Sequence, residues 1–102
     1  MIEAASRAFL LLSLQRALLG NVRPALRQVS IEADVLLQVV RVRYEHQGEL
    51  GDRDRYCLSR ASTEVIADFA SPWNLEEQYS NSSTLAPLAQ IGYRRFEVDH
   101  DA

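Results

Sequence analysis

Apolar residues change their spacing once the chain passes Pro24, and this change limits the possible folds more than any other feature. Before that point, apolar side chains recur at helical spacing within residues 2–19, at Ala5, Phe9, Leu12 and Leu19. After it, apolar and polar residues alternate, which is the pattern of a strand with one buried face. The sequence therefore predicts a first helix over residues 2–19, ended by Gly20, and strands after it.

The alternating pattern covers two neighbouring segments. One runs from Leu26 to Ala33, and the other runs from Leu36 to Tyr44. Because so few residues separate them, we expect an antiparallel pair that is joined near residues 33–35. The loop "EHQGELGD" contains two glycines and ends the second strand.

The rest of the chain predicts a helix and two shorter strands. The helix begins near Asp52, where carboxylates suit a helix N-terminus, and runs to about Ala70. The segment "NLEEQYSN" reads as a short strand and "QIGYRRFEV" as the last one. The apolar residues of the last strand are out of register, which a bulge at Gly92 or at residues 94–95 would repair.

Length and composition place these elements in one domain, residues 1–102. Hydrophobic residues make up 47% of the chain and charged residues 25%, which is ordinary for a soluble globular protein. A chain of 102 residues is too short to build a second core. We therefore expect an α+β fold in the order α-β-β-α-β-β, with a mainly antiparallel sheet packed against two helices.

Charge and hydropathy narrow the possible partners. A net charge of -3 argues against nucleic-acid binding and permits a basic protein partner. The apolar run near the N-terminus is shorter than the roughly 20 residues that a membrane span needs. No small-residue cleavage site follows that run in a convincing place. We expect a cytoplasmic protein that binds neither nucleic acid nor a membrane.

Glu64 and Asp68 are the strongest candidates for chemistry, because they lie one helical turn apart. They could share a cation or act as general acid and base. A transition metal would need His or Cys beside them, but His46 is expected in a loop and His100 lies near the C-terminus. Cys57 falls on an apolar helix stripe, where an inert buried thiol is the commoner outcome. The sequence therefore predicts no catalytic, metal-binding or cofactor-binding residue and no cofactor.

Acidic side chains are concentrated between residues 52 and 77, at Asp52, Asp54, Glu64, Asp68, Glu76 and Glu77. Such a cluster could steer a cationic partner, or it could be the ordinary charged face of a soluble helix. Trp73 follows a proline at the helix exit. It is either a lid on the core, which the usual burial of Trp favours, or an exposed anchor for a partner.

Three segments resemble a family of small bacterial proteins that includes immunity proteins of contact-dependent growth inhibition systems. They are "RALLGNVRPALRQVSIE", "ASTEVIADFASPWNLEE" and "YRRFE", at residues 16–32, 61–77 and 93–97. The resemblance implies a cytoplasmic antidote that binds the C-terminal domain of a toxin, often a nuclease. Such a protein blocks its toxin stoichiometrically and carries out no chemistry of its own. On this interpretation the contact residues are Glu64, Asp68, Trp73, Glu76 and Glu77.

Other interpretations stay open at this point. The contact surface could instead be the exposed side of the first helix or the loop "EHQGELGDRD". The protein could also be a homo-oligomeric structural or regulatory subunit, such as a homodimer, with residues 35–44 as a pairing edge. A small enzyme that uses Glu64 and Asp68 is the remaining alternative.

Overall fold

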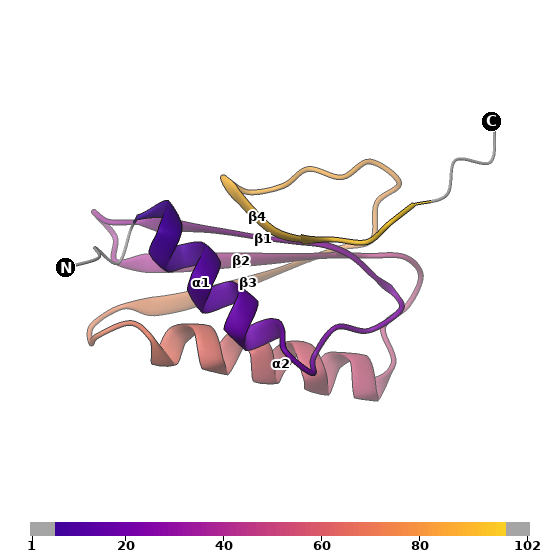
Figure 1. Ribbon diagram of the computed structural model, residues 1–102, viewed down its shortest axis with the longest axis horizontal. Coiled ribbons are helices and arrows are strands. Elements are labelled where there is room, and N and C mark those ends of the chain that lie inside the picture. The colour runs from indigo at the N-terminus through magenta and orange to yellow at the C-terminus, as the bar shows by residue number, and fades with distance from the viewer. Residues whose placement is uncertain (1–5, 98–102) are drawn as a thin grey trace.

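The computed structural model describes residues 6–97, which form two helices and one sheet (Figure 1). In chain order the elements are α1 (Arg7–Leu18), β1 (Leu26–Asp34), β2 (Val39–His46), α2 (Asp52–Ala67), β3 (Asn74–Ser80) and β4 (Gln90–Arg94). The expected α+β fold and its order of elements are therefore confirmed. Neither helix is long and apolar enough to cross a membrane.

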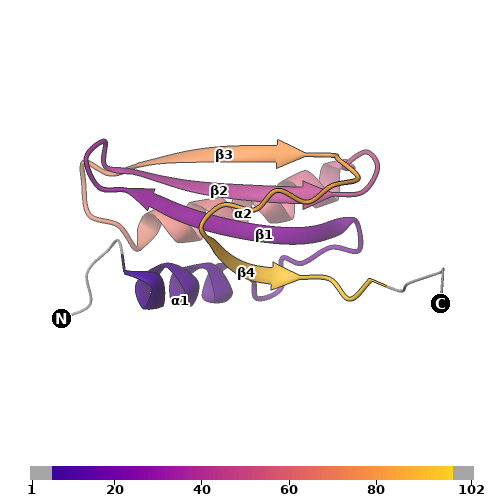
Figure 2. The same ribbon diagram turned by 90° about the horizontal axis from the view of Figure 1, so that it is seen from above.

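The sheet has four strands in the order β3-β2-β1-β4 (Figure 2). Strand β1 pairs antiparallel with both β2 and β4, whereas β2 pairs parallel with β3. The parallel pair follows from the chain path, because α2 carries the chain back before β3 begins. The expectation that residues 35–44 offer a pairing edge is wrong, since β2 lies inside the sheet between β1 and β3.

Both helices cover one face of the sheet, and the core lies between them and the strands (Figure 1). Five apolar residues of the predicted strand alternation face this core and are fully buried: Val29, Ile31, Val40, Val42 and Tyr44. Leu58, Ala61 and Val65 meet them from α2. The alternation therefore identified the buried face of both strands.

The first helix begins with a side-chain cap, because Ser6 Oγ accepts a hydrogen bond from Phe9 N at 3.1 Å. The predicted start at residue 2, with Ala5, lies outside the described residues. The predicted buried stripe is wrong in part, since the side chains of Leu12 and Leu19 are 51% and 76% exposed. The buried side of α1 is formed instead by Leu10, Ser13, Leu14, Ala17 and Leu18.

Three predicted boundaries shift. Residues 35–38 form the turn between β1 and β2, so the second strand begins at Val39 rather than at Leu36. The second helix ends at Ala67, three residues before the predicted end at Ala70. His46 ends β2 and is buried, although a loop position was expected. In each case the pattern predicted the element correctly, and only its first or last residues differ.

A bulge in β4 sits at one of the two predicted positions. Val29 pairs with Tyr93 and Ser30 pairs with Ile91, which leaves Gly92 without a partner in β1. Gly92 also faces Leu14 of α1 so closely that a Cβ atom at this position would overlap the leucine side chain. A residue without a side chain is therefore required where β4 passes under α1.

The connection from β3 to β4 crosses the face of the sheet that the helices leave open (Figures 1 and 2). It has to cross the sheet because β3 and β4 form opposite edges, and the helices already cover the other face. Polar side chains of β1 and β2 hold this connection: Ser30 Oγ accepts from Leu88 N at 2.8 Å, and Glu45 Oε1 accepts from Ala86 N at 2.6 Å.

Candidate partner-binding surface

The carboxylates predicted on α2 differ in their surroundings. Asp68 Oδ2 accepts hydrogen bonds from Ser13 Oγ at 2.7 Å and from Arg16 Nη2 at 3.0 Å. Asp68 therefore ties the end of α2 to α1. Glu64 is exposed and makes no hydrogen bond or ion pair with other residues in the range 6–97. Of this pair, Asp68 already contacts α1, whereas Glu64 has no such contact among the described residues.

Glu76 and Glu77 lie on opposite faces of the sheet, because neighbouring residues of a strand point in opposite directions. Glu76 Oε2 accepts from Arg41 Nε at 3.2 Å on the face that the helices leave open. Glu77 Oε2 accepts from Ser62 Oγ of α2 at 2.7 Å, on the helix face. The carboxylates predicted as one contact region are therefore divided between two faces.

Glu77 belongs to a hydroxyl network that includes two tyrosines. Tyr79 Oη donates to Glu77 Oε2 at 2.8 Å, and Tyr44 Oη lies 2.7 Å from Ser62 Oγ. Burial raises the pKa of both phenols far above its ordinary range, and for Tyr79 the hydrogen bond to Glu77 adds to this shift. Both phenols therefore stay neutral at physiological pH. The network holds the Glu77 carboxylate in place and supplies no ionised phenol that could react.

Trp73 covers one end of the core. Its ring packs against Phe69 with the ring centres 5.2 Å apart, and Phe69 in turn meets Phe9 edge-on at 5.3 Å. Trp73 is half-buried, so part of the residue stays accessible. This position agrees with the interpretation of Trp73 as a lid on the core, and it also leaves surface for a partner to touch.

Arg41 gathers three carboxylates on the open face of the sheet. Its guanidinium nitrogens lie 3.3 Å from Glu32, 3.8 Å from Asp34 and 3.2 Å from Glu76. We call Glu32, Asp34, Glu76 and Arg41 the acidic patch. With three carboxylates and one guanidinium, the acidic patch has a local charge of -2.

The turn beside the acidic patch carries three consecutive apolar side chains that face solvent. Val35, Leu36 and Leu37 are 58%, 95% and 64% exposed, and we call them the apolar tip. Sequence reasoning missed the tip because it assigned Leu36 and Leu37 to a strand. The signal was present, since "VLL" between Asp34 and Gln38 interrupts the alternation on both sides.

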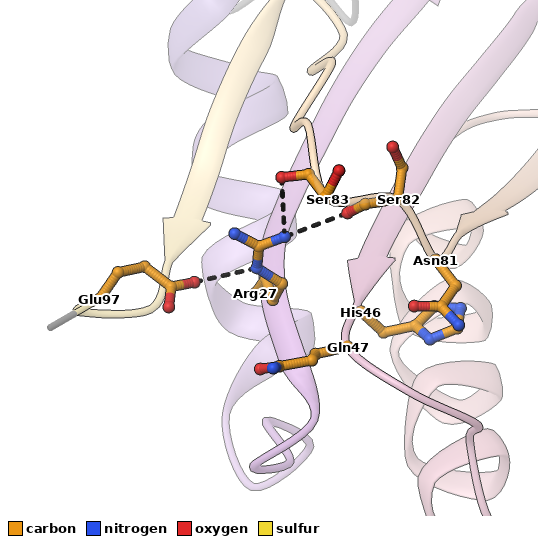
Figure 3. A pocket seen from close by; sticks show the side chains of 7 residues that line it. All are labelled: Arg27, His46, Gln47, Asn81, Ser82, Ser83 and Glu97. Carbon is orange, nitrogen blue, oxygen red and sulfur yellow. Dashed lines mark hydrogen bonds and ion pairs between the residues drawn. The ribbon is translucent and has the colours of Figure 1, made fainter. Parts of the chain in front are cut away.

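A polar hollow of about 380 Å³ opens at the far end of β1 and is lined by Arg27, His46, Gln47, Asn81, Ser82, Ser83 and Glu97 (Figure 3). The guanidinium of Arg27 donates to Glu97 Oε1 at 3.0 Å and to the carbonyl oxygens of Ser82 and Ser83. Hydrogen bonding to Arg27 is the main cause that lowers the pKa of Glu97. These contacts use the charged groups of the hollow to fasten the crossing connection to β1.

Among residues 6–97, the side chains of this hollow form no catalytic or metal-binding arrangement. His46 Nδ1 lies 2.7 Å from the carbonyl oxygen of Gly48, and no hydrogen bond joins His46 to Ser82 or Ser83 in that range. The same residues contain no group of three His, Cys, Asp or Glu side chains that could hold a metal ion. Cys57 is half-buried on α2 and unpaired.

Comparison with known protein families assigns this chain to a family. A family model described as MafI2 immunity protein matches residues 7–97, which is most of the chain. The chain belongs to the MafI2 immunity protein family. A comparison with curated proteins finds no match.

Membership in the MafI2 family confirms the resemblance at the level of a bacterial immunity protein. The match begins at the first residue of α1 and ends three residues after β4, so every element of the fold lies inside the family region. The acidic patch, the apolar tip and all five predicted contact residues also lie inside it. An immunity protein acts on a toxin, so these surfaces are candidates for contact with a protein partner.

Proposed function

We propose that this MafI2 family member is a cytoplasmic antidote that binds its cognate toxin and neutralises it by stoichiometric masking. The family match over residues 7–97 is the observation that carries the proposal. We further propose that the toxin belongs to a contact-dependent growth inhibition system, that the bound part is its C-terminal domain and that this domain is a nuclease. The net charge of -3 supports a basic partner, because enzymes that act on nucleic acids present basic surfaces.

Masking requires no chemistry from the antidote. A standard interface covers about 800 Å² of each partner. The surface of this protein measures 6424 Å², so one face of the molecule is large enough. Charge complementarity would raise the association rate, and a few buried apolar anchors would lengthen the life of the complex.

The enzyme alternative finds less support in the geometry. A general acid and base pair needs carboxylates that can reach a substrate. Asp68 is instead held by Ser13 and Arg16, and its Oδ2 atom already accepts two hydrogen bonds. Metal analysis of the purified protein separates the two functions, since a tightly held stoichiometric metal has no place in the masking mechanism.

The five predicted contact residues remain a proposal, and the fold changes how they should be tested. A double reversal of Glu64 and Asp68 to Lys would break the contact of Asp68 with Arg16 and destabilise the protein. Glu64→Lys alone keeps that contact and changes a side chain that faces solvent. We expect this variant to stay folded, to associate with the toxin more slowly and to show a weaker salt dependence.

Co-purification tests the function itself. The tagged protein is expressed together with the product of the gene immediately upstream in its own genome, and growth is followed in parallel. We expect a one-to-one complex and rescue from toxicity. A toxic upstream product that neither binds this protein nor loses its toxicity would refute the proposed antidote role for this pair.

A further inference from the structure

The apolar tip is the most unusual feature of the surface. Single exposed apolar side chains are common on soluble proteins, but contiguous ones at a turn mark interaction sites. Here Leu36 is 95% exposed, and its neighbours Val35 and Leu37 are more than half exposed. Turns favour polar residues and glycine, so local backbone geometry does not explain why these three positions are apolar.

Hydrogen bonds brace the backbone of the turn that carries the tip. Asp34 Oδ1 accepts a hydrogen bond from Leu37 N at 3.1 Å, which spans the turn. Gln38 closes the turn at a φ of 52°, and its carbonyl oxygen accepts from Asn74 N at 3.0 Å. Because these contacts already order the backbone, binding through the tip would lose little conformational entropy.

The acidic patch lies directly beside the tip on the open face. Asp34 is the last residue of β1, while Glu32 and Arg41 form a cross-strand pair two positions further along the sheet. Glu76 is paired with Arg41 from the other side. An apolar projection is thus bordered on one side by a local charge of -2, which follows from three carboxylates around one guanidinium.

The place of the tip in the molecule suits contact with a concave partner. The turn between β1 and β2 lies at one end of the long axis, at the same end as the start of α1 and the connection from α2 to β3 (Figures 1 and 2). That connection carries Trp73, whose half-buried ring offers a second apolar contact. Aromatic and apolar anchors bordered by charge are the usual composition of an interface centre and rim.

We propose that the apolar tip inserts into an apolar pocket of the cognate toxin whose rim carries Arg or Lys, with the acidic patch facing that rim. This inference rests on the proposed antidote function and identifies the surface that performs it. Charge complementarity selects this occupant over two others. An anionic membrane would repel the acidic patch. A second copy docked tip to tip about a two-fold axis would bring two acidic patches together.

Neutral substitutions at the tip test the inference without changing charge. The variants are Leu36→Ser and the double variant Leu36→Ser/Leu37→Ser, and the matched control is Leu19→Ser. Leu19 is also an exposed leucine, with 76% of its surface accessible, but it lies at the end of α1. The toxin domain is recovered from the co-expressed complex with denaturant and refolded, and binding is measured by calorimetry or interferometry.

We expect Leu36→Ser to weaken binding about 30-fold, the loss that corresponds to an interface hot spot, and the double variant to weaken it further. Leu19→Ser should bind like the wild type. Thermal unfolding of all variants should match the wild type, because the substituted side chains face solvent. Unchanged binding by both tip variants, with tight binding by the wild type, would overturn the inference and leave the antidote function intact.

Two further outcomes have separate meanings. A wild-type protein that does not bind the refolded toxin, although the toxin is active, would refute the antidote function and with it the tip as a toxin contact. Light scattering after size-exclusion chromatography reports on self-association. A wild-type dimer that dissociates in the Leu36→Ser variant would overturn the inference, because the tip would then contact a second copy.

Discussion

At the scale of single residues, Asp54 joins the α1–β1 connection to the start of α2. Arg23 Nε donates to Asp54 Oδ1 at 2.8 Å, and the backbone N–H of Gly51 donates to Oδ2 at 3.0 Å. The hydrogen bond from Arg23 is the main cause that lowers the pKa of Asp54, and the bond from Gly51 is the next. The charged form also suits the first turn of α2, where the helix dipole is positive.

The lowered pKa of Asp54 predicts an acid-dependent loss of stability. The folded state binds the proton of Asp54 more weakly than the unfolded chain does, for which the pKa is about 3.9. The carboxylate therefore stabilises the fold above that pH, and the contribution disappears as the pH falls through the lower folded value. We expect Asp54→Asn to be less stable than the wild type at pH 7 in urea denaturation.

The difference between Asp54→Asn and the wild type should shrink as the pH falls from about 4 through the lower folded-state pKa, because the unfolded chain is protonated first and the folded carboxyl last. Asp52→Asn is the matched control, since it removes one negative charge from the same helical turn. Asp52 makes no side-chain hydrogen bond to residues 6–97, so we expect little change. A constant difference across the pH range would contradict the assigned role of the Arg23–Asp54 pair.

The close approach of Gly92 to Leu14 can be tested by substitutions at these two residues. A Cβ at position 92 would overlap the side chain of Leu14, which is fully buried. We expect Gly92→Ala to destabilise the fold by about 1–3 kcal/mol through overpacking. Leu14→Ala alone should cost about 2–5 kcal/mol because it leaves a cavity.

The double variant Gly92→Ala/Leu14→Ala should be more stable than the sum of the single effects predicts, because the shortened side chain makes room for the new methyl group. Coupling between residues in contact is typically about 0.5–3 kcal/mol. Denaturant unfolding of the wild type, the two single variants and the double variant measures this coupling free energy. Strict additivity would mean that the close approach of β4 to α1 does not explain the glycine.

At the scale of elements, the connection from β3 to β4 explains why polar residues are buried on the outer face of the sheet. Glu45 is 2% exposed and accepts from Gln28 Nε2 at 2.8 Å as well as from Ala86 N. Arg43 donates to the carbonyl oxygen of Ala86 from the same strand. The connection thus closes one half of the open face, and the acidic patch occupies the other half.

Removal of the Glu45 carboxylate should release this connection. We expect Glu45→Ala to destabilise the protein by about 1–3 kcal/mol, since buried hydrogen-bond donors lose their acceptor. Limited proteolysis should then cut within residues 81–89 faster than in the wild type. Glu49→Ala, at an exposed glutamate, is the control and should leave the cleavage rate unchanged. Equal cleavage rates in both variants would show that other contacts hold the connection.

The elements and the antiparallel β1–β2 pair could be predicted from local patterns, but the pairings of β3 and β4 could not. Alternation identified the core faces of β1 and β2, and the break in register predicted a bulge at Gly92 or at residues 94–95, of which the structure has the first. The phase of α1 was ambiguous because "FLLLSL" is apolar on every side. The buried side was fixed by distant contacts instead, namely Ser13 with Asp68 and Leu14 with Gly92.

The candidate contact residues show the same limit of sequence reasoning. Sequence alone indicates that Glu64, Asp68 and Glu77 are charged, but not which of them the fold already uses. Asp68 meets Arg16 across 52 residues of chain and Glu77 meets Ser62 across 15, which only the packed structure brings together. The acidic patch likewise depends on the strand order, because Glu76 reaches Arg41 only through the parallel β2–β3 pair.

At the scale of the whole molecule, charge is distributed unevenly along an axis of 45 Å. At the end opposite the tip, Arg23, Arg27 and Arg95 pair with Asp54 and Glu97, three positive charges with two negative ones. The tip end carries the acidic patch, in which three carboxylates share Arg41. We expect a positively charged partner to orient a molecule with this distribution before contact, so that the apolar tip leads.

This orientation predicts which charges control the rate of toxin binding. Glu32→Gln/Glu76→Gln removes two charges from the acidic patch, and Glu49→Gln/Asp52→Asn removes two at the opposite end. Each pair changes the net charge from -3 to -1, which is -3 plus two removed negative charges. Stopped-flow association with the toxin domain is measured across a range of salt concentrations for both pairs and the wild type.

We expect the patch variant to associate about tenfold more slowly at low salt, the lower end of measured steering effects, and to depend less on salt. The control pair should retain most of the wild-type rate, because its charges lie far from the contact relative to a Debye length of about 8–10 Å. Equal slowing by both pairs would mean that net charge alone attracts the toxin. The acidic patch would then not face the toxin in the encounter, and charge complementarity would no longer support the proposed contact between the tip and the toxin.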